Sequence, residues 1–288
     1  MITQTITHPS RRSRGATTRV VLAAVALAAA AGLTGPTATQ AAARSDGSVP
    51  ASPAVIAAVA GVPATVLDGV GIGSVAPFGP KSIWNVKRLA GAPVAGGQKV
   101  NVLSINVAWC PHCAANSWPL AVALSRFGTL SGLRTIDTGT YYGKVLKAKP
   151  AHPHTLGLSF LRSTYVSDYL TFSPVVLQTR AGRLLQRPTK AEAKRQASFD
   201  REGQVPALAV GDVFGFRGAG YSPGALKGRS AGQIAAALAD PGVSTTKAIL
   251  GEANVLTAAI CVTTGGNPAA VCTAPGVKAS AARLPRRG

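Results

Sequence analysis

Two cysteines separated by two residues are the part of the sequence best suited to chemistry. Cys110 and Cys113 directly follow the apolar run 99–107. That run alternates valine with polar residues and then becomes almost continuously apolar, which predicts a buried strand. In residues 111–127 apolar side chains recur at helical spacing, and Gly128 follows, which predicts a helix and its end. The cysteine pair therefore lies where a strand ends and a helix begins.

This position favours thiol–disulfide exchange. Free N–H groups and the helix dipole stabilise a thiolate at a helix N-terminus. We expect Cys110 to lie at the exposed end and to be the nucleophile, and Cys113, one turn into the helix, to be the resolving thiol. Two intervening residues let the sulfurs form a disulfide with limited strain, and exchange proceeds through a mixed disulfide on Cys110.

The residues around the pair fit the same chemistry. Pro111 falls in the first helical turn, where its missing N–H costs nothing. His112 can hydrogen-bond to a Cys110 thiolate or stabilise it by charge, and a low thiol pKa makes the disulfide oxidising. We expect Trp109, immediately before the motif, to contact the substrate.

The N-terminus has the pattern of an export signal. Arginines at 11, 12, 14 and 19 precede the apolar run 20–33, and the small residues 41–43 offer a cleavage site. The run is shorter than the roughly 20 residues of a spanning helix. We expect residues 1–43 to be a signal peptide or an N-terminal anchor. The protein is then extracytoplasmic, either secreted or anchored to the outer face of the cytoplasmic membrane by residues 20–33.

Export changes what the charge of this 288-residue chain indicates. The net charge is +20, and it is still +16 without residues 1–43, which hold four arginines and no acidic residue. Nucleic acid is an unlikely partner outside the cytoplasm, whereas an anionic envelope surface is a candidate. The densest basic stretch is 180–195, which on its own is typical of a solvated surface.

The four cysteines form an even set in an oxidising compartment, which predicts two disulfides, Cys110–Cys113 and Cys261–Cys272. The second pair encloses a short, turn-rich segment. We expect it to attach the last helix to the tail, with electron transfer to the first pair as the alternative.

Other elements follow from periodicity, caps and turn residues. Helices are predicted over residues 53–60, 63–70, 189–199, 230–238 and 246–261, and strands over 83–86, 133–138, 205–210 and 213–216, with a loop around 141–143.

The order of these features resembles the thioredoxin superfamily. The shared features are a strand, the Cys-Pro-His-Cys motif, a helix, and later Val205-Pro206 before a hairpin. Residues 110–118 and 123–128 also resemble an exported thioredoxin-like family known as domain of unknown function 929. The resemblance implies that Pro206 is a cis proline beside the cysteines and that the backbone around Val205 pairs with a substrate peptide. Asn116 and Ser117 depart from the resemblance, which would place a charged pair there.

These observations predict an α/β protein with a thioredoxin-like fold, in which helices flank a central mixed sheet. From Cys113 to Pro206 is 93 positions, more than a strand and a crossover need, so we expect an inserted segment at about 140–195. The predicted divisions are a linker or helical segment over 44–80, the thioredoxin-like domain over 81–275 and a frayed basic tail over 276–288.

The expected function is thiol–disulfide exchange, of oxidase or isomerase type, on exported proteins. The partners are then exported thiols or disulfides and an unidentified redox partner, with no cofactor. A redox-inactive binding scaffold is one alternative. A copper or zinc metallochaperone is another, with Cys110 and Cys113 joined by His152 and His154. The direction of electron flow does not follow from the motif.

Overall fold

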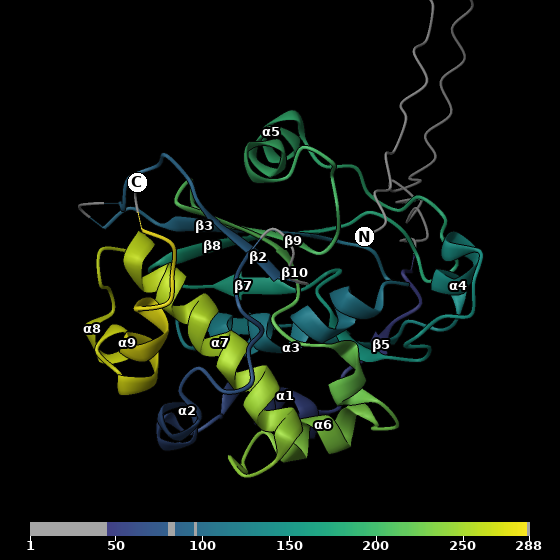
Figure 1. Cartoon of the computed structure of the whole chain (residues 1–288), viewed down its shortest axis with the longest axis horizontal. Helices are drawn as coiled ribbons and strands as arrows, with labels where there is room; N and C mark the ends of the chain where they lie inside the picture. The colour runs from purple at the N-terminus through teal and green to yellow at the C-terminus, as the bar shows by residue number, and fades with distance from the viewer. Residues whose placement is uncertain (1–44, 80–83, 95–96, 287–288) are drawn as a thin grey trace, which may run out of the picture.

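The computed structural model describes residues 45–79, 84–94 and 97–286. At its centre is a five-stranded mixed sheet with the strand order β2-β10-β9-β3-β8 (Figure 1). β3 and β8 are parallel, and every other neighbouring pair is antiparallel. The strands are β2 (Trp84–Arg88), β3 (Val100–Asn106), β8 (Leu170–Val176), β9 (Ala207–Val210) and β10 (Phe214–Gly218).

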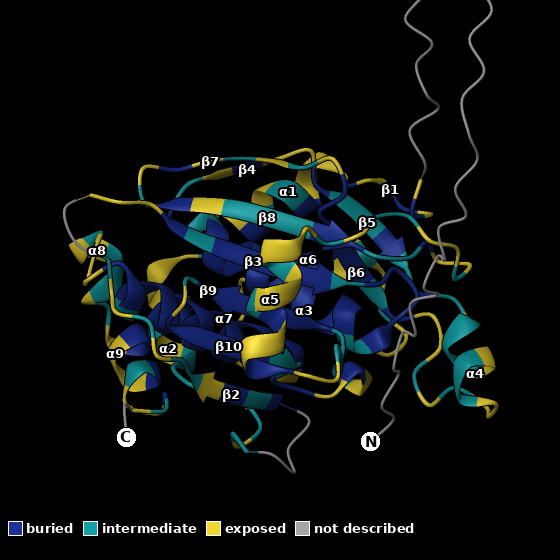
Figure 2. Cartoon of the chain, turned by 90° about the horizontal axis from the view of Figure 1, so that it is seen from above, coloured by how far each residue is buried: buried dark blue, intermediate teal, exposed yellow. Residues whose placement is uncertain are grey.

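Helices cover both faces of this sheet. On one face α3 (Pro111–Ser125) packs against α7 (Ser244–Thr263), and on the other lies α5 (Lys190–Phe199) (Figure 1). Colouring by burial shows β3, β9 and much of α3 and α7 as the buried centre of the molecule (Figure 2). The chain is thus a mixed α/β structure whose sheets are flanked by helices, compatible with a thioredoxin-like fold.

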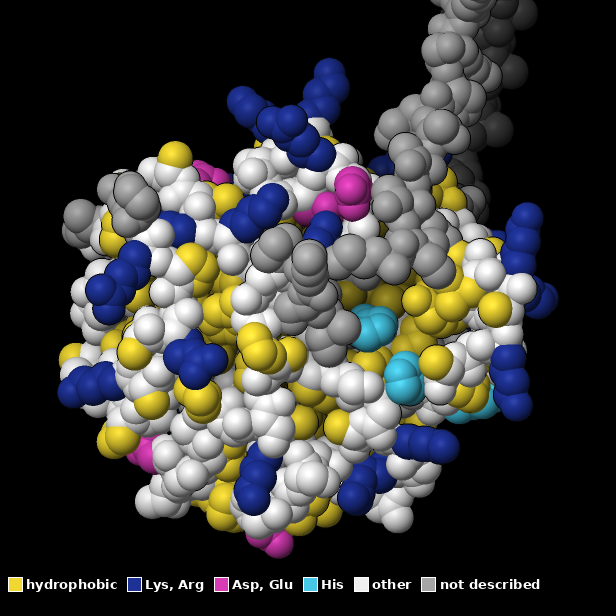
Figure 3. Space-filling model, in the orientation of Figure 1, with side chains coloured by type: hydrophobic (Ala, Val, Ile, Leu, Met, Phe, Trp, Pro, Cys, Tyr) yellow, Lys and Arg dark blue, Asp and Glu magenta, His cyan; other side chains and the backbone are white. Residues whose placement is uncertain are grey.

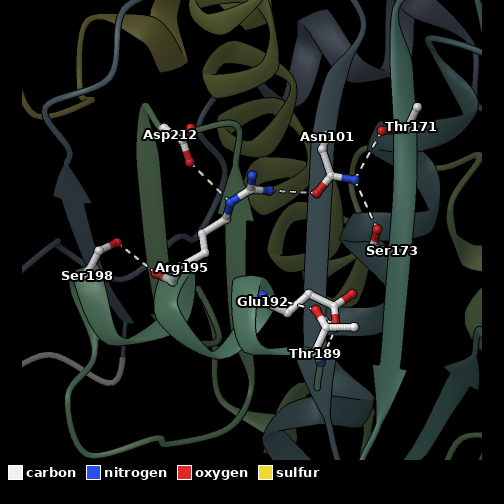
Figure 4. A network of polar contacts seen from close by, with 8 residues as sticks. All are labelled: Asn101, Thr171, Ser173, Thr189, Glu192, Arg195, Ser198 and Asp212. Atoms are coloured by element: carbon white, nitrogen blue, oxygen red, sulfur yellow. Dashed lines mark hydrogen bonds and ion pairs between the residues drawn. The ribbon is translucent and has the colours of Figure 1, made fainter. Parts of the chain in front are cut away.

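A polar network joins α5 to the sheet (Figure 4). Arg195 donates to Oδ1 of Asn101 on β3 at 2.7 Å, and it is paired with Asp212 in the β9–β10 turn at 3.1 Å. Asn101 donates in turn to the hydroxyls of Thr171 and Ser173 on β8, at 3.0 Å each. These bonds fix the position of α5 and of the chain that follows it toward Val205.

The N-terminal segment, for which the sequence left a linker or a helical segment open, is helical and packs on the domain. The helices expected there are present as α1 (Pro53–Ala60) and α2 (Ala64–Val70). Their apolar side chains Val55, Val59 and Leu67 are buried in the main core. The alternation of alanine and valine supplies an apolar helix face, and burial of that face holds the segment on the domain.

The C-terminal segment is folded over more residues than the sequence predicts. α8 (Ala269–Cys272) and α9 (Pro275–Ala281) follow α7, and α9 packs against α7 and α2. Val277, Ser280 and Leu284 are buried, so the tail predicted to fray is folded as far as Leu284. The few apolar side chains of this segment are spaced at helical intervals, but the prediction of a frayed tail was based on its basic composition alone.

Residues 126–169 form smaller elements beside the central layers. They are β4 (Thr129–Ser131), β5 (Arg134–Asp137), α4 (Tyr141–Leu146), β6 (Leu156–Ser159) and β7 (Thr164–Val166). β5 and β6 make a small sheet with β1 (Val49–Pro50), and β4 pairs with β7. The insertion predicted at 140–195 is not confirmed, because that range contains β8 and α5, which belong to the central layers.

The remaining elements are a 3₁₀ turn (Pro223–Leu226) and α6 (Ala231–Ala237), which packs against α1 and α7. The predicted signal segment lies outside the described residues. In the described part of the chain no single helix is long and apolar enough to cross a membrane. α1 and α2 together meet that test by length and composition, with a bend of 66° between them.

Candidate active site around Cys110 and Cys113

The cysteine motif lies at the junction that the sequence predicts. Cys110 is the N-cap residue of α3, and Pro111 is the first residue of the helix. The backbone N–H of Cys113 donates to Sγ of Cys110 at 3.3 Å. The capping position thus directs a free helix N–H at the first sulfur, and Pro111 occupies the first helical position, where a missing N–H costs nothing.

Two features of the pair differ from the prediction. Both cysteines are free thiols, so the Cys110–Cys113 disulfide is not formed and the structure is that of the dithiol. Cys110 is also not exposed, since 4% of its surface is accessible against 7% for Cys113. Aromatic side chains from α4 pack against the residues around the two cysteines. The prediction of an exposed Cys110 used only the strand–helix junction, which does not show that another helix covers it.

The two thiols have pKa values shifted in opposite directions. Burial acts to raise the pKa of Cys110, but hydrogen bonds from the Cys113 side chain and from the backbone of Cys113 and His112 outweigh it, so the pKa is lowered. For Cys113, burial and then the hydrogen bond and charge of Cys110 raise the pKa well above its usual value. Cys110 is therefore the thiol that ionises first.

His112 does not act through the charge that we expected. Burial, and then the nearby His152, lower the pKa of His112 to about 4, so its imidazole is neutral at pH 7. The contribution of His112 to the thiolate comes from its backbone N–H, which lowers the pKa of Cys110. Of the two roles predicted for this side chain, a hydrogen bond or charge, the neutral ring does not supply the charge, because partial burial disfavours its protonated form.

A groove of about 110 Å³ opens onto Cys110. Its walls come from the end of β3 and the start of α3, from α4, and from residues 203–205 after α5. Most of the lining is apolar or aromatic: Val107, Trp109, Tyr142, Val145, Leu146, Leu177 and Val205. On the face drawn in Figure 3, a recess with apolar walls lies next to histidine side chains. Cys110 is thus reached through an apolar passage.

Trp109 is held in this groove by two kinds of contact. Its indole N–H donates to Oε1 of Gln178 at 2.6 Å. Its ring stacks on Tyr142 with 5.9 Å between centroids and is tilted against Tyr141 at 5.7 Å. Trp109 thus forms part of the wall of the groove at Cys110, and its contact with a substrate stays a prediction.

Val205 and Pro206 lead into β9, the strand next to β3, and Val205 lies beside the cysteine motif. The Val205–Pro206 peptide bond is cis, and Val205 packs in one cluster with Trp109, Cys110 and Cys113. The Pro206 carbonyl accepts from the N–H of Gly218 at 2.9 Å. The backbone N–H and carbonyl of Val205 have no hydrogen-bond partner among the described residues.

The contribution of α4 could not be read from the sequence. We expected a loop around residues 141–143, but Tyr141 to Leu146 form a short helix that lines the groove. The available signal is a pair of adjacent tyrosines in a chain with only 5% aromatic residues. Their placement over Trp109 depends on the path of the chain between β5 and β6.

Asn116 and Ser117, which depart from the family resemblance, have structural partners. Asn116 donates from Nδ2 to Oε1 of Glu252 on α7 at 2.6 Å. Glu252 is fully buried and also accepts from the N–H of Gly220 at 2.7 Å. Burial raises the pKa of Glu252 to about 8, although both hydrogen bonds act to lower it. The ionisable group at this part of the helix pair thus comes from α7.

The residues proposed for a metal site are not brought together. His154 is bound to Asp137 at 3.0 Å and is largely exposed, whereas His152 lies near His112. Within the described ranges no three His, Cys, Asp or Glu side chains are arranged to hold a metal ion.

The second cysteine pair forms the predicted disulfide. Cys261 and Cys272 are bonded with 5.4 Å between their Cα atoms. The bond joins the end of α7 to α8, and both views place α8 at the opposite side of the molecule from α4 (Figures 1 and 2). This position suits attachment of the tail and leaves the disulfide far from Cys110.

Fold and site together define a mixed α/β protein with a buried dithiol at a helix N-terminus. Residues 86–196 match the family model described as Domain of unknown function (DUF929), which confirms the resemblance predicted from the motif. The matched segment contains β3, the cysteine motif, α4 and most of α5, and it ends before Pro206. No curated protein and no solved structure matches the chain.

Proposed function

We propose that the protein is an extracytoplasmic thiol–disulfide oxidoreductase, of oxidase or isomerase type, that acts on exported proteins. The observation that carries the proposal is the asymmetry of the cysteine pair. Cys110 caps α3 and has a lowered pKa, whereas the pKa of Cys113, one turn further, is raised. One thiol is therefore ready to attack, and the other stays protonated until a mixed disulfide exists.

The strand order supports a thioredoxin-like core. β3, α3 and parallel β8 form a βαβ unit, and α5, the β9–β10 hairpin and α7 follow. In this interpretation α5 is the second crossover, and the additional residues lie between α3 and β8, at 126–169. The insertion is then placed earlier than the sequence predicts, and it carries α4.

The exchange reaction needs only the two thiols and a client disulfide. The Cys110 thiolate attacks one client sulfur, forms a mixed disulfide and expels the other client sulfur as a thiolate, which takes up a proton. Cys113 then loses its proton to solvent, attacks Sγ of Cys110 and releases the second client thiolate. Two electrons pass from the protein to the client, and the same steps in reverse oxidise a client dithiol.

The backbone at Val205 supports binding of an extended client segment. Its N–H and carbonyl have no partner among the described residues, and its side chain lines the groove at Cys110. An extended peptide that pairs with these groups receives main-chain hydrogen bonds while its cysteine faces Cys110.

The location and the surface partner remain proposals from the sequence. An export signal in residues 1–43 places the protein outside the cytoplasm. Basic side chains are spread over the face drawn in Figure 3, where few acidic groups are seen, which is compatible with an anionic envelope surface.

Single-cysteine variants test the function directly. With a disulfide-bonded exported client, Cys113→Ser should accumulate a mixed disulfide on Cys110, and Cys110→Ser should trap none. Wild type should complete the exchange, and the reduction potential of its cysteine pair should lie in the range of known thiol oxidases or isomerases. Equal trapping by both variants would contradict the assigned roles.

The burial of both sulfurs favours one other candidate, a redox-inactive binding scaffold. A scaffold predicts that the redox state of Cys110 and Cys113 does not follow the ratio of reduced to oxidised glutathione. The intrinsic fluorescence of the protein, which contains Trp109 next to Cys110, provides a readout for that titration.

A further inference from the structure

We propose that the groove at Cys110 selects clients with a large apolar side chain next to the reacting cysteine and acidic residues beyond it. This inference rests on the proposed function and names its substrate class. The occupant is an extended client segment, and α4 with the residues that follow it is the element that recognises the segment.

The apolar part of this preference follows from the lining of the groove. Tyr142, Val145 and Leu146 of α4 face Leu177 and Val205 across the opening. The groove is about 110 Å³ in volume and is bordered by Cys110 itself. A side chain of leucine size that enters it leaves water for contact with apolar groups. A client residue reaches this position only when it lies next to the cysteine under attack.

The acidic part follows from the charges at the rim. Lys147 follows Leu146 directly and Lys149 lies two positions further, while Arg201 precedes the wall formed by residues 203–205; all three are exposed. On the other side of α4, Lys144 and Arg180 line a shallow depression of about 380 Å³. Lys144, Lys147, Lys149 and Arg201 form no ion pair with a carboxylate among the described residues, whereas Arg180 acts electrostatically on the carboxyl of Asp137.

The acidic side chains near the groove already have partners. Glu202 lies 3.7 Å from Arg217 and accepts from Gln204, and Asp200, also near Arg217, is buried. Asp137 is bound to His154. The rim therefore carries an excess of positive charge, which favours an acidic segment over a basic one at moderate ionic strength.

Four symmetric peptide disulfides test both preferences. In each, two copies of one short peptide are joined through a single cysteine, so attack on either sulfur gives the same product. The residue before the cysteine is Leu or Ser, and the two flanking residues beyond are Glu or Lys. Reduced wild-type protein is mixed with each peptide, and the single-turnover rate is divided by the rate with 2-hydroxyethyl disulfide, which is small and neutral.

The Leu peptides should react about tenfold faster than the Ser peptides, because only they bury an apolar side chain in the groove. The Glu peptides should react about threefold faster than the Lys peptides at low salt, and 0.5 M salt should remove this difference. The preference for Leu should remain in high salt.

Two variants assign the preferences to α4. Val145→Ser should lower the ratio of Leu to Ser rates, whereas Val166→Ser, the same change at an exposed valine on β7, should leave it unchanged. Lys144→Glu should lower the ratio of Glu to Lys rates toward one, because the other rim cations remain. Lys278→Glu makes the same charge change on α9, away from α4 (Figure 1), and should leave that ratio unchanged.

The outcomes separate this inference from the proposed function. No reaction with 2-hydroxyethyl disulfide would overturn the proposed function and the client class with it. Reaction with that probe at equal normalised rates for all four peptides would overturn only the client class. An effect of Lys144→Glu on binding to anionic lipid vesicles, with no effect on the peptide ratios, would assign the rim to a membrane surface and equally overturn it.

Discussion

The backbone N–H of Cys113 and Sγ of Cys110 are joined by a hydrogen bond of 3.3 Å inside a buried site. Burial alone disfavours a thiolate, so this bond and its neighbours decide which sulfur ionises. We expect Cys113→Ala to raise the pKa of Cys110, because the side-chain donor is lost while the backbone donor remains. Cys113→Ser keeps a hydroxyl donor and should give a smaller rise. Thiolate absorbance at 240 nm against pH measures both, and equal pKa values in the three proteins would contradict this account.

The neutral His112 has a consequence at acidic pH. Its pKa is about 4 in the folded protein and about 6.5 in an unfolded chain, so the unfolded state binds the proton more readily. The stability contributed by this group is present above pH 6.5 and is lost as the pH falls toward 4. Imidazole NMR signals should titrate near pH 4, and His112→Gln should remove this part of the acid destabilisation. A titration of His112 near pH 6.5 would show that the ring is solvated.

Glu252 gives the stability of the fold the opposite dependence on pH. Its pKa is raised to about 8 in the fold, so the stability linked to its proton is complete below about pH 4.5 and declines as the pH rises through 8. The unfolding free energy should fall by roughly 1.4 kcal/mol per pH unit from this group across that window. Glu252→Gln loses an acceptor for Asn116 or Gly220 and should be less stable at pH 5.

The comparison over pH is the useful measurement for Glu252. Denaturant unfolding at pH 5, 6.5 and 8 should show the deficit of Glu252→Gln shrinking with pH, because unfolded wild type releases a proton that the folded protein keeps. A deficit that is constant over pH would mean that the carboxyl is ionised throughout. Tyr221, packed nearby, has a pKa raised well above its usual value, first by burial and then by Glu252, so it does not titrate in this window.

The Cys261–Cys272 disulfide should contribute stability and no exchange activity. It closes a loop with a sequence separation of 11, for which chain entropy gives about 3 kcal/mol. The double variant Cys261→Ala/Cys272→Ala should lose about that much unfolding free energy. Its rate with 2-hydroxyethyl disulfide should match that of wild type at a temperature where both are folded, and a slower rate would favour the role in electron transfer.

The exposed lysines of α5 test the proposed anionic surface. Lys190 and Lys194 are four residues apart on the outer side of a helix whose inner side buries Phe199. Each lysine near an anionic membrane contributes about 1 kcal/mol, so Lys190→Glu/Lys194→Glu should weaken binding to phosphatidylglycerol vesicles at least tenfold at low salt. Lys278→Glu serves as the charge control. Unchanged binding in the double variant would locate any membrane contact elsewhere.

The local features were accessible from the sequence because they depend on neighbouring residues. The strand before Cys110, the N-cap position of that cysteine and the place of Pro111 follow from periodicity and cap chemistry over about ten residues. The capping box of Thr189 and Glu192 fixes the start of α5 in the same way. The pairing of Cys261 with Cys272 followed from a short loop and an even cysteine count.

Contacts between residues that are far apart in the sequence were visible only in the tertiary structure. Asn116 and Glu252 are 136 positions apart, and their contact exists because α3 packs on α7. The exposure of Cys110 and the charge of His112 were misjudged for a related reason, since both depend on which side chains cover the helix start. Burial is a property of the folded surface, and no spacing within the motif encodes it. The sequence thus determined which residues we propose for disulfide exchange, and the fold decided how they are covered, which thiol ionises first and what lines the groove at Cys110.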